Sequence, residues 1–233
     1  ALEKRILEAM PAIEHWLRGK WQQHTIPFYC SVDLRNSGFK LAPVDTNLFP
    51  GGFNNLNTDF LPLCVQAMMA AVEKICPEAH SILIIPESHT RNIYYLQNVH
   101  VLERMMRHAG LNIRIGSLIP EITEPTPINL PDGNTLLLEP IVRKGNRLSV
   151  GNFDPCAILL NNDLSSGIPD NLKNLDQIII PPIHAGWTTR LKSQHFTAYD
   201  RVAQEFAELI NIDAWLINPY FNSCGKIDFH EEK

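Results

Sequence analysis

The chain has 233 residues, of which 45% are hydrophobic and 19% charged, and its formal net charge is −5. That length can bury a sizeable core, either as one large domain or as a domain with an appendage. The mildly acidic balance, with no basic run and no alternation of basic and aromatic residues, argues against partners such as nucleic acid or an acidic membrane surface.

The cysteines and the apolar runs indicate the compartment. An odd number of cysteines without CxxC spacing argues against a disulfide framework and against a zinc ribbon. Cys64 and Cys156 are expected to be small core residues, whereas Cys30 and Cys224 lie beside polar turn residues. No run reaches the roughly 18 apolar residues that span a bilayer. Because the N-terminus is charged and lacks the apolar core of a secretory signal, we expect a cytoplasmic location.

The first 44 residues predict helices followed by a strand pair. Apolar residues recur at helical spacing from residue 2 to about residue 20, and Pro11 is expected to kink or split this helix. The apolar run from Ile26 to Val32 is expected to be a strand, with Phe39 to Val44 as its partner.

The stretch from Ser31 to Leu56 is the least generic part of the sequence, and we call it the signature. Arg35 offers a planar fork that matches a carboxylate, while Asp33 and Asp45 are suited to hold an ammonium group. Three amides that each offer a donor and an acceptor accompany them: Asn47, Asn54 and Asn55. These groups predict an amino-acid binding site. The alternative is that Asx residues and glycines build turns while the phenylalanines anchor a buried loop.

A βαβ pattern follows the signature. After a helix that starts near Asn57, Thr58 or Asp59 and ends near Ile75, residues 81–85 are expected to form a strand, 90–109 a helix and 112–116 a second strand. Such a unit implies a parallel sheet. The helix ending near Ile75 is expected to bury one apolar face, formed by Phe60, Cys64, Ala67, Met68, Ala71 and Ile75.

Residues 120–151 interrupt that rhythm with five prolines and two turn signals. Between the turns, 135–142 and 147–150 are expected to pair as an inserted β-hairpin. The short apolar runs 156–160 and 177–180 then fit buried parallel strands. Ligands of open α/β sheets bind at the carboxyl ends of strands, so three polar segments are candidate site walls. These are 87–91, 161–163 and 181–184, with loop and helix-cap chemistry as the equally weighted alternative.

The second candidate segment runs from His184 to Phe196, just before a helix. A turn at Gly186 and an aromatic wall at Trp187 accompany the permanent cations Arg190 and Lys192, together with Thr188, Thr189 and His195. This collection suits a substrate carboxylate or phosphate oxygens. The alternative is a solvated helix start. A continuous apolar face from Phe196 to Ile210 supports the helix, and 213–218 is expected to be one more strand.

Several catalytic motifs are missing from the sequence. It contains no phosphate-binding P-loop, no Rossmann glycine fingerprint, no nucleophile elbow and no H-E-x-x-H zinc motif. What remains is substrate binding by cations and amides, so neither catalytic residues nor metal ligands are assigned.

Three phrases carry a family resemblance: VDLRNSGFKLAPVDTNLFPGGFNNL (Val32 to Leu56), ILLNNDLSSGIP (Ile158 to Pro169) and PPIHAGWTTRLKSQHF (Pro181 to Phe196). Together they resemble the glutamate-cysteine ligase family found in some proteobacteria. The resemblance implies ATP-dependent joining of the L-glutamate γ-carboxylate to the L-cysteine amine, the first step of glutathione synthesis. It also implies an ATP-grasp-like enzyme with an acyl-phosphate intermediate and Mg²⁺.

The resemblance also suggests how the chain is organised. Residues 1–76 are expected to form helices and the signature loop, packed on an α/β domain of residues 77–233 with the hairpin insertion at about 120–151. That domain is expected to be Rossmann-like, of the pre-ATP-grasp type, with a mostly parallel sheet flanked by helices. Family members are longer, and the part that resembles their ATP-binding half lies beyond Lys233, so activity of this portion alone stays open. Oligomeric state, a homo-oligomer included, stays open too.

Our leading hypothesis is therefore a ligase portion that binds glutamate and cysteine. It places one group of substrate-binding residues opposite another across a cleft: Arg35, Asn47, Asn54 and Asn55 opposite Arg190 and Lys192. One alternative is a noncatalytic α/β module that binds a small amino acid or a nucleotide. A purely structural or oligomerisation domain is the other.

Overall fold

The computed structural model describes residues 2–88, 92–186, 189 and 191–219. Contacts between residues divide the chain into two compact units. Unit 1 combines Ala1–Asn47 with Trp187–Lys233, and unit 2 is Leu48–Gly186. This partition differs from the expected boundary between residues 76 and 77, which stays a prediction about independently folding domains.

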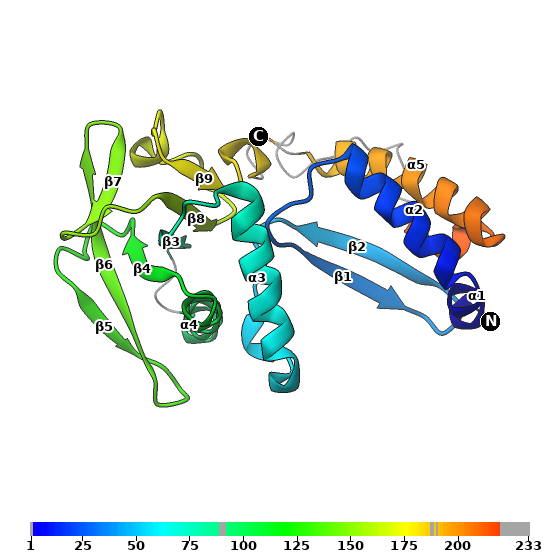
Figure 1. The fold of residues 1–233 in the computed structure, drawn as a ribbon, viewed down its shortest axis with the longest axis horizontal. Helices are drawn as coiled ribbons and strands as arrows, with labels where there is room; N and C mark the ends of the chain where they lie inside the picture. The colour runs from blue at the N-terminus through cyan, green and yellow to red at the C-terminus, as the bar shows by residue number, and fades with distance from the viewer. Residues whose placement is uncertain (1, 89–91, 187–188, 190, 220–233) are drawn as a thin grey trace. The chain divides into compact units, whose positions relative to one another are not determined.

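The centre of unit 2 is a seven-stranded, mostly parallel sheet (Figure 1). Its strand order is β5-β6-β4-β3-β8-β9, with β7 paired to β6. Parallel pairing joins β6 to β4 and continues through the core strands, which are β4 (Asn112–Ser117), β3 (Ser81–Pro86), β8 (Ala157–Asn161) and β9 (Ile178–Ile180). Residues 82–85 and 157–160 are at most 1% exposed, as expected for parallel strands buried on both faces. The predicted α/β class is confirmed.

The expected hairpin is confirmed and is joined to this sheet. β6 (Thr135–Lys144) and β7 (Arg147–Val150) pair antiparallel, and β6 also pairs with β4 through Gly116 and Ser117. A further strand, β5 (Thr126–Asn129), pairs antiparallel with β6 at the edge of the sheet. Strand β5 was not predicted, because Pro127 argues against a strand, although an edge strand tolerates proline.

Helix α4 (Ile93–His108) packs against β4 and against helix α3 (Leu61–Ile75). On the face of α4 that packs inward, Val99, Leu102 and Met106 are fully buried and Tyr95 is half-buried. The helix begins later than expected because Asn92 caps it, accepting a hydrogen bond from the backbone N–H of Tyr95 at 3.1 Å.

The start and the face of α3 also differ from the prediction. Two 3₁₀ turns, η1 (Phe53–Asn55) and η2 (Thr58–Phe60), precede the helix, and Asn57 caps η2. Phe60, expected on the buried face, is 57% exposed, whereas Met68 and Val72 are the buried residues of α3. Two further 3₁₀ turns, η3 (Asp170–Leu172) and η4 (Ile183–Ala185), lie in the segments after β8 and β9.

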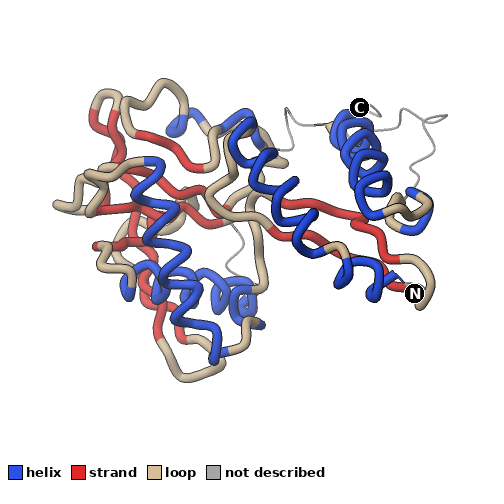
Figure 2. Tube along the Cα trace, turned by 45° about the vertical axis from the view of Figure 1, so that its right-hand side comes forward, coloured by secondary structure: helices blue, strands red, loops and turns tan. Residues whose placement is uncertain are grey.

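Unit 1 contains a two-stranded antiparallel hairpin with helices beside it (Figure 2). The helices are α1 (Leu2–Glu8), α2 (Met10–Gln23) and α5 (Lys192–Ile210). Pro11 occupies the first turn of α2, which confirms the predicted split, because proline is tolerated there and not within a helix. Helices α2 and α5 pack against each other, with the rings of Trp16 and Phe206 edge-on at 5.7 Å.

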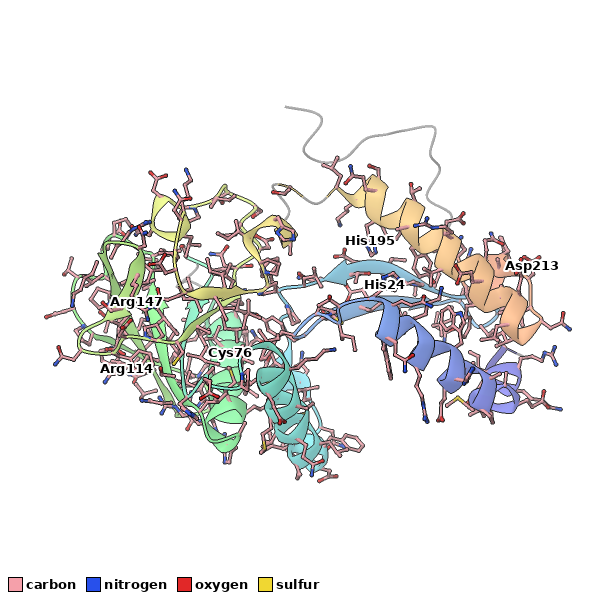
Figure 3. All side chains as sticks on the ribbon, turned by 45° about the horizontal axis from the view of Figure 1, so that its top comes forward. His24, Cys76, Arg114, Arg147, His195 and Asp213 are labelled. Atoms are coloured by element: carbon pink, nitrogen blue, oxygen red, sulfur yellow. The ribbon has the colours of Figure 1, made fainter. Side chains whose placement is uncertain are left out.

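Two strand predictions in unit 1 were wrong in position or in kind. The first strand, β1, spans Ser31–Asn36 and not residues 26–32, and its partner β2 spans Leu41–Asn47. Residues 213–218 form the 3₁₀ turn η5 (Ala214–Leu216) in place of a strand. The side chain of Asp213, labelled in Figure 3, accepts a hydrogen bond from the Trp215 N–H at 2.8 Å, and this local cap favours a helical turn.

Candidate functional site

In unit 1 the signature forms the β1–β2 hairpin. The register places Asp33 opposite Asp45 and Ser31 opposite Asn47. Arg35 lies two residues beyond Asp33 and pairs with Ala42, after an irregularity in the register between Asp33 and Leu34. Its guanidinium is exposed and has no ion pair or hydrogen bond among the described residues, which leaves it open to a carboxylate from outside the chain.

The hairpin also meets the second candidate segment. Lys192 is the first residue of α5, and its Nζ lies 3.4 Å from Oδ1 of Asp45. The structure therefore brings together two predicted groups that lie 147 positions apart in the sequence. Lys192 offsets the two carboxylates that face each other across the hairpin, because like charges directly opposite destabilise a strand pair.

Other members of the signature have a structural task. The ring of Phe39 stacks on Trp215 at 5.7 Å, and the ammonium of Lys40 lies 4.8 Å from the centre of the same ring. In the second segment, the ring of His195, labelled in Figure 3, packs edge-on against Phe196 at 5.1 Å. These contacts favour structural roles for Phe39, Lys40 and His195, although Phe39 is exposed and does not anchor a buried loop.

In unit 2 the signature continues as a loop that ends in η1. Gly52 adopts φ +85°, a conformation that glycine reaches without strain, and thereby allows the turn before Phe53. The backbone N–H of Phe53 donates to Oδ1 of the buried Asn98 at 2.7 Å. Asn54 and Asn55 are exposed on this turn, and their side chains have no hydrogen-bond partner among the described residues.

A buried network ties the same loop to the carboxyl edge of the sheet. Asn161, at the end of β8, donates from Nδ2 to the carbonyl oxygen of Pro50 at 2.8 Å. The hydroxyl of Tyr95 lies 2.6 Å from the backbone oxygen and 3.0 Å from Oδ1 of Asn161, and it accepts a hydrogen bond from the Glu87 N–H at 2.9 Å. The polar end of β8, proposed as a site wall, thus holds the signature loop in place.

The residues after Asn161 form turns. Oδ1 of Asn162 accepts from the Leu164 N–H at 2.9 Å, and Oδ1 of Asp163 accepts from the Ser165 N–H at 2.8 Å. A Cβ added at Gly186 would lie 2.9 Å from the carbonyl oxygen of Asp163, so this glycine permits a close backbone approach. These contacts favour the loop-chemistry alternative for 162–163 and for Gly186.

Part of the prediction lies outside the described residues, namely His89, Thr90, Arg91, Trp187, Thr188 and Arg190. The remaining predicted substrate-binding residues fall into two groups: Arg35, Asn47 and Lys192 in unit 1, and Asn54 and Asn55 in unit 2. Their opposition across a cleft stays a prediction.

A pocket of about 140 Å³ opens in unit 2 between the signature loop, α3 and α4. Asn54 is the predicted site residue that lines it, and Arg104 of α4 is a lining residue that was not predicted. Arg104 follows Val101 by three positions, so both reach the same face of α4. A cation beside an apolar helix face is common on protein surfaces, so the sequence alone gave no signal to single out Arg104.

The cysteines differ from the prediction. Cys156, expected in the core, is exposed, and Cys64 is half-buried and lines the pocket. A hydrogen bond with the Ser81 hydroxyl, with Sγ and Oγ 3.1 Å apart, lowers the pKa of the Cys156 thiol below its usual range. No His, Asp or Glu side chain is hydrogen-bonded to this thiol among the described residues, so it has no base partner that would suggest a catalytic thiol.

Two searches of the described ranges bear on metals and membranes. Residues 2–88, 92–186, 189 and 191–219 contain no group of three or more His, Cys, Asp or Glu side chains placed to hold a metal ion. Within the same part of the chain, every helix is too short or too polar to cross a bilayer.

Comparison with known proteins identifies the family. The family model described as GshA, glutamate-cysteine ligase, matches residues 3–233. The crystal structure of a candidate gamma-glutamylcysteine synthetase from Methylobacillus flagellatus KT is 68% identical to this chain and superposes with a TM-score of 0.92. The match covers 98% of this chain and 54% of that one, so the chain spans about half the length of that relative. No curated protein sequence matches significantly. The chain belongs to the GshA family of glutamate-cysteine ligases.

Proposed function

We propose that this chain provides amino-acid binding groups of an enzyme that joins the γ-carboxylate of L-glutamate to the amine of L-cysteine. Family membership over residues 3–233 is the observation that carries the proposal. The exposed guanidinium of Arg35 and the exposed amides of Asn54 and Asn55 support it, because each leaves hydrogen-bonding capacity for a ligand.

The proposed substrate-binding residues are those predicted from the sequence: Arg35, Asn47, Asn54, Asn55, Arg190 and Lys192. Arg35 would bind a carboxylate of glutamate through its planar fork. Lys192 and Asp45 together would present one cation and one anion, which matches the paired charges of an α-amino acid. The amides would fix the orientation of the substrate by donating and accepting hydrogen bonds.

The chemistry is ATP-dependent in this proposal. The γ-phosphoryl group of ATP passes to the γ-carboxylate of glutamate, a bond to the carboxylate oxygen forms, and ADP leaves. The cysteine amine then attacks the acyl carbon, so the C–N bond forms while the C–O bond to phosphate breaks. Phosphate leaves with the bonding electrons, and the amine proton passes to solvent. The chain's contribution is to hold the carboxylate and the amine in reacting position.

The proposed reaction uses ATP and Mg²⁺, which the family implies. The described residues supply neither a cluster of three acidic or histidine ligands nor a glycine-rich phosphate loop. A cytoplasmic location is likewise proposed, and it is supported by the free thiols of Cys30, Cys64, Cys76 and Cys156.

Phosphate release by the longest natural form of the protein tests the proposed reaction. With ATP and magnesium present, release should require glutamate, and γ-glutamylcysteine should appear when cysteine is added. No turnover in any combination, together with glutamate binding by calorimetry, would refute ligation and favour a noncatalytic amino-acid binding module.

Arg35→Ala in the same form tests the role of the signature. Losing a charge-assisted hydrogen bond to a carboxylate should raise the KM for glutamate about 10- to 100-fold. The circular dichroism spectrum should not change, because the Arg35 side chain is exposed. Arg18→Ala is the control, since its side chain is 72% exposed and outside the proposed site. Wild-type glutamate kinetics in Arg35→Ala would remove Arg35 from the site.

A further inference from the structure

The pocket of unit 2 differs in chemistry from the hairpin of unit 1. Its walls are mainly apolar and include Phe53, Leu61, Val101 and Met105. The walls contain two sulfur atoms, one from Met105 and one from Cys64, and sulfur atoms pack favourably against aromatic rings. Such walls fit a small side chain that is apolar or contains sulfur.

The pocket carries one positive charge. Arg104 is the one charged residue among those that line it, and no aspartate or glutamate does so. Within the described residues, the guanidinium of Arg104 has no ion pair and no hydrogen bond. The pocket therefore offers a charged binding partner for one carboxylate and no carboxylate that would form an ion pair with an ammonium group.

A buried donor lies beside the same wall. Asn98 is 2% exposed, and its Oδ1 accepts from the N–H of Phe53, which lines the pocket. Its Nδ2 has no hydrogen-bond partner among the described residues. Leaving a buried donor unsatisfied is costly, so an oxygen atom brought in by a ligand or by a shift of the Phe53 loop would be favoured there.

The two amino acids of the proposed reaction differ in the features that this pocket distinguishes. Glutamate carries two carboxylates and a polar side chain, whereas cysteine carries one carboxylate and a small thiol. Cysteine also attacks through its amine, which must be unprotonated to react. A carboxylate beside that amine would hold it as ammonium and slow the attack.

We infer that this pocket binds the cysteine substrate, with its carboxylate on Arg104 and its thiol side chain against the apolar wall. The inference rests on the proposed ligase function and assigns a separate place to the second substrate. Asn54, which lines the pocket, would then contact cysteine and not glutamate.

Protection of Cys64 from alkylation tests the inference without turnover. The probe is L-2-aminobutyrate, which has the shape of cysteine but no thiol and so does not consume N-ethylmaleimide. Labelling of each cysteine is followed by peptide mass spectrometry on the full chain. We expect 2-aminobutyrate to slow the labelling of Cys64 at least several-fold, glutamate to have no effect, and the exposed Cys156 to react equally in every sample.

Arg104→Gln should abolish this protection, while Arg18→Gln should retain it. If Arg104→Gln fails to fold, the inference is still tested by comparing how strongly 2-aminobutyrate and glutamate protect Cys64 in the wild-type chain. Absence of protection by 2-aminobutyrate, or equal protection by glutamate, would overturn the inference.

Kinetics of the longest natural form separate this inference from the proposed function. Arg104→Gln should raise the KM for cysteine about 10- to 100-fold and leave the KM for glutamate unchanged. A wild-type enzyme that makes γ-glutamylcysteine, with an Arg104→Gln variant of normal KM for cysteine, would refute the pocket assignment alone. A wild-type protein that makes no γ-glutamylcysteine would refute the proposed function.

Discussion

Asn161 ends strand β8, and its side chain connects the sheet to the signature loop. The residue is 1% exposed, and its amide contacts both the Pro50 carbonyl and the Tyr95 hydroxyl. Asn161→Ala would leave the carbonyl oxygen of Pro50 without its hydrogen bond from Nδ2, whereas the Tyr95 hydroxyl would keep its hydrogen bonds with the backbone oxygen of residue 161 and with the Glu87 N–H. We expect the free energy of unfolding, measured by urea denaturation with far-ultraviolet circular dichroism, to fall by about 2–3 kcal/mol.

Asn152→Ala is the matched control for this loss. Asn152 is exposed on a turn of the same unit, and its side chain has no hydrogen-bond partner among the described residues. Its substitution should change the free energy of unfolding by less than about 0.5 kcal/mol. Equal stability of the Asn161 and Asn152 variants would mean that the network does not hold the loop.

At the scale of single residues, the sequence predicts which residue types are important better than it predicts which residues they contact. The polar end of β8 was recognisable because Asn161 follows an apolar run, but its partner Pro50 lies 111 positions away. Asn98 likewise lies among apolar residues of α4, and its contact with Phe53 depends on the tertiary fold. A side chain that supports a loop and one that binds a ligand have the same local pattern, so Asn161 was predicted as a site wall.

Helix α3 contains two adjacent methionines in opposite environments. Met68 is 7% exposed, whereas Met69 is 53% exposed. Met68→Ala removes buried contacts and leaves a cavity, so we expect a loss of about 2–5 kcal/mol in the free energy of unfolding. Met69→Ala removes little buried surface, and alanine is at least as good a helix former as methionine, so the free energy of unfolding should change by less than about 0.5 kcal/mol.

Denaturation curves of the two methionine variants provide the measurement, and each variant serves as control for the other. A similar loss in both would show that the exposed side of α3 is covered in solution. Leu63, which is 59% exposed on the same helix, would then be expected to behave like Met69.

Elements with a strong local pattern were predicted well. The buried strands β3 and β8 are continuous apolar runs, and α4 has a clear 3.6-residue period, so local sequence was sufficient. Segments whose apolar residues are compatible with more than one secondary structure were not predicted well. Residues 213–218 have a strand-like composition, but Ala214 and Ile217 are both buried and lie three positions apart, which is the spacing of a helical turn.

At the scale of the molecule, the predicted site residues belong to two compact units. Unit 1 contains Arg35, Asn47 and Lys192. At least 144 residues of sequence separate Lys192 from the other two, and the contact between Lys192 and Asp45 is what shows that Lys192 lies beside the hairpin. Family resemblance, by contrast, was visible in the sequence because it depends on contiguous phrases. The sequence thus indicates the family and the residue types of the site, whereas their grouping requires the fold.

The distribution of tryptophan allows unit 1 to be followed by itself. All four tryptophans, Trp16, Trp21, Trp187 and Trp215, lie in the sequence ranges of unit 1. Tryptophan fluorescence during urea denaturation should therefore report on unit 1, while circular dichroism reports on both units.

Alkaline pH offers a way to destabilise unit 1 through one buried hydroxyl. Tyr199 on α5 donates a hydrogen bond to the carbonyl oxygen of Ile217 at 3.0 Å, and burial raises its pKa from 10.0 to about 12. Between these values an unfolded chain has lost the proton that the folded chain keeps, so the free energy of unfolding falls as pH rises. The stabilisation is fully present below pH 10 and is lost by about pH 12.

Tyr199→Phe removes this titration while the other ionisable groups remain, so its fluorescence-detected urea midpoint should fall less steeply over that range. Parallel decline of the two midpoints would show that Tyr199 does not resist ionisation in the folded state.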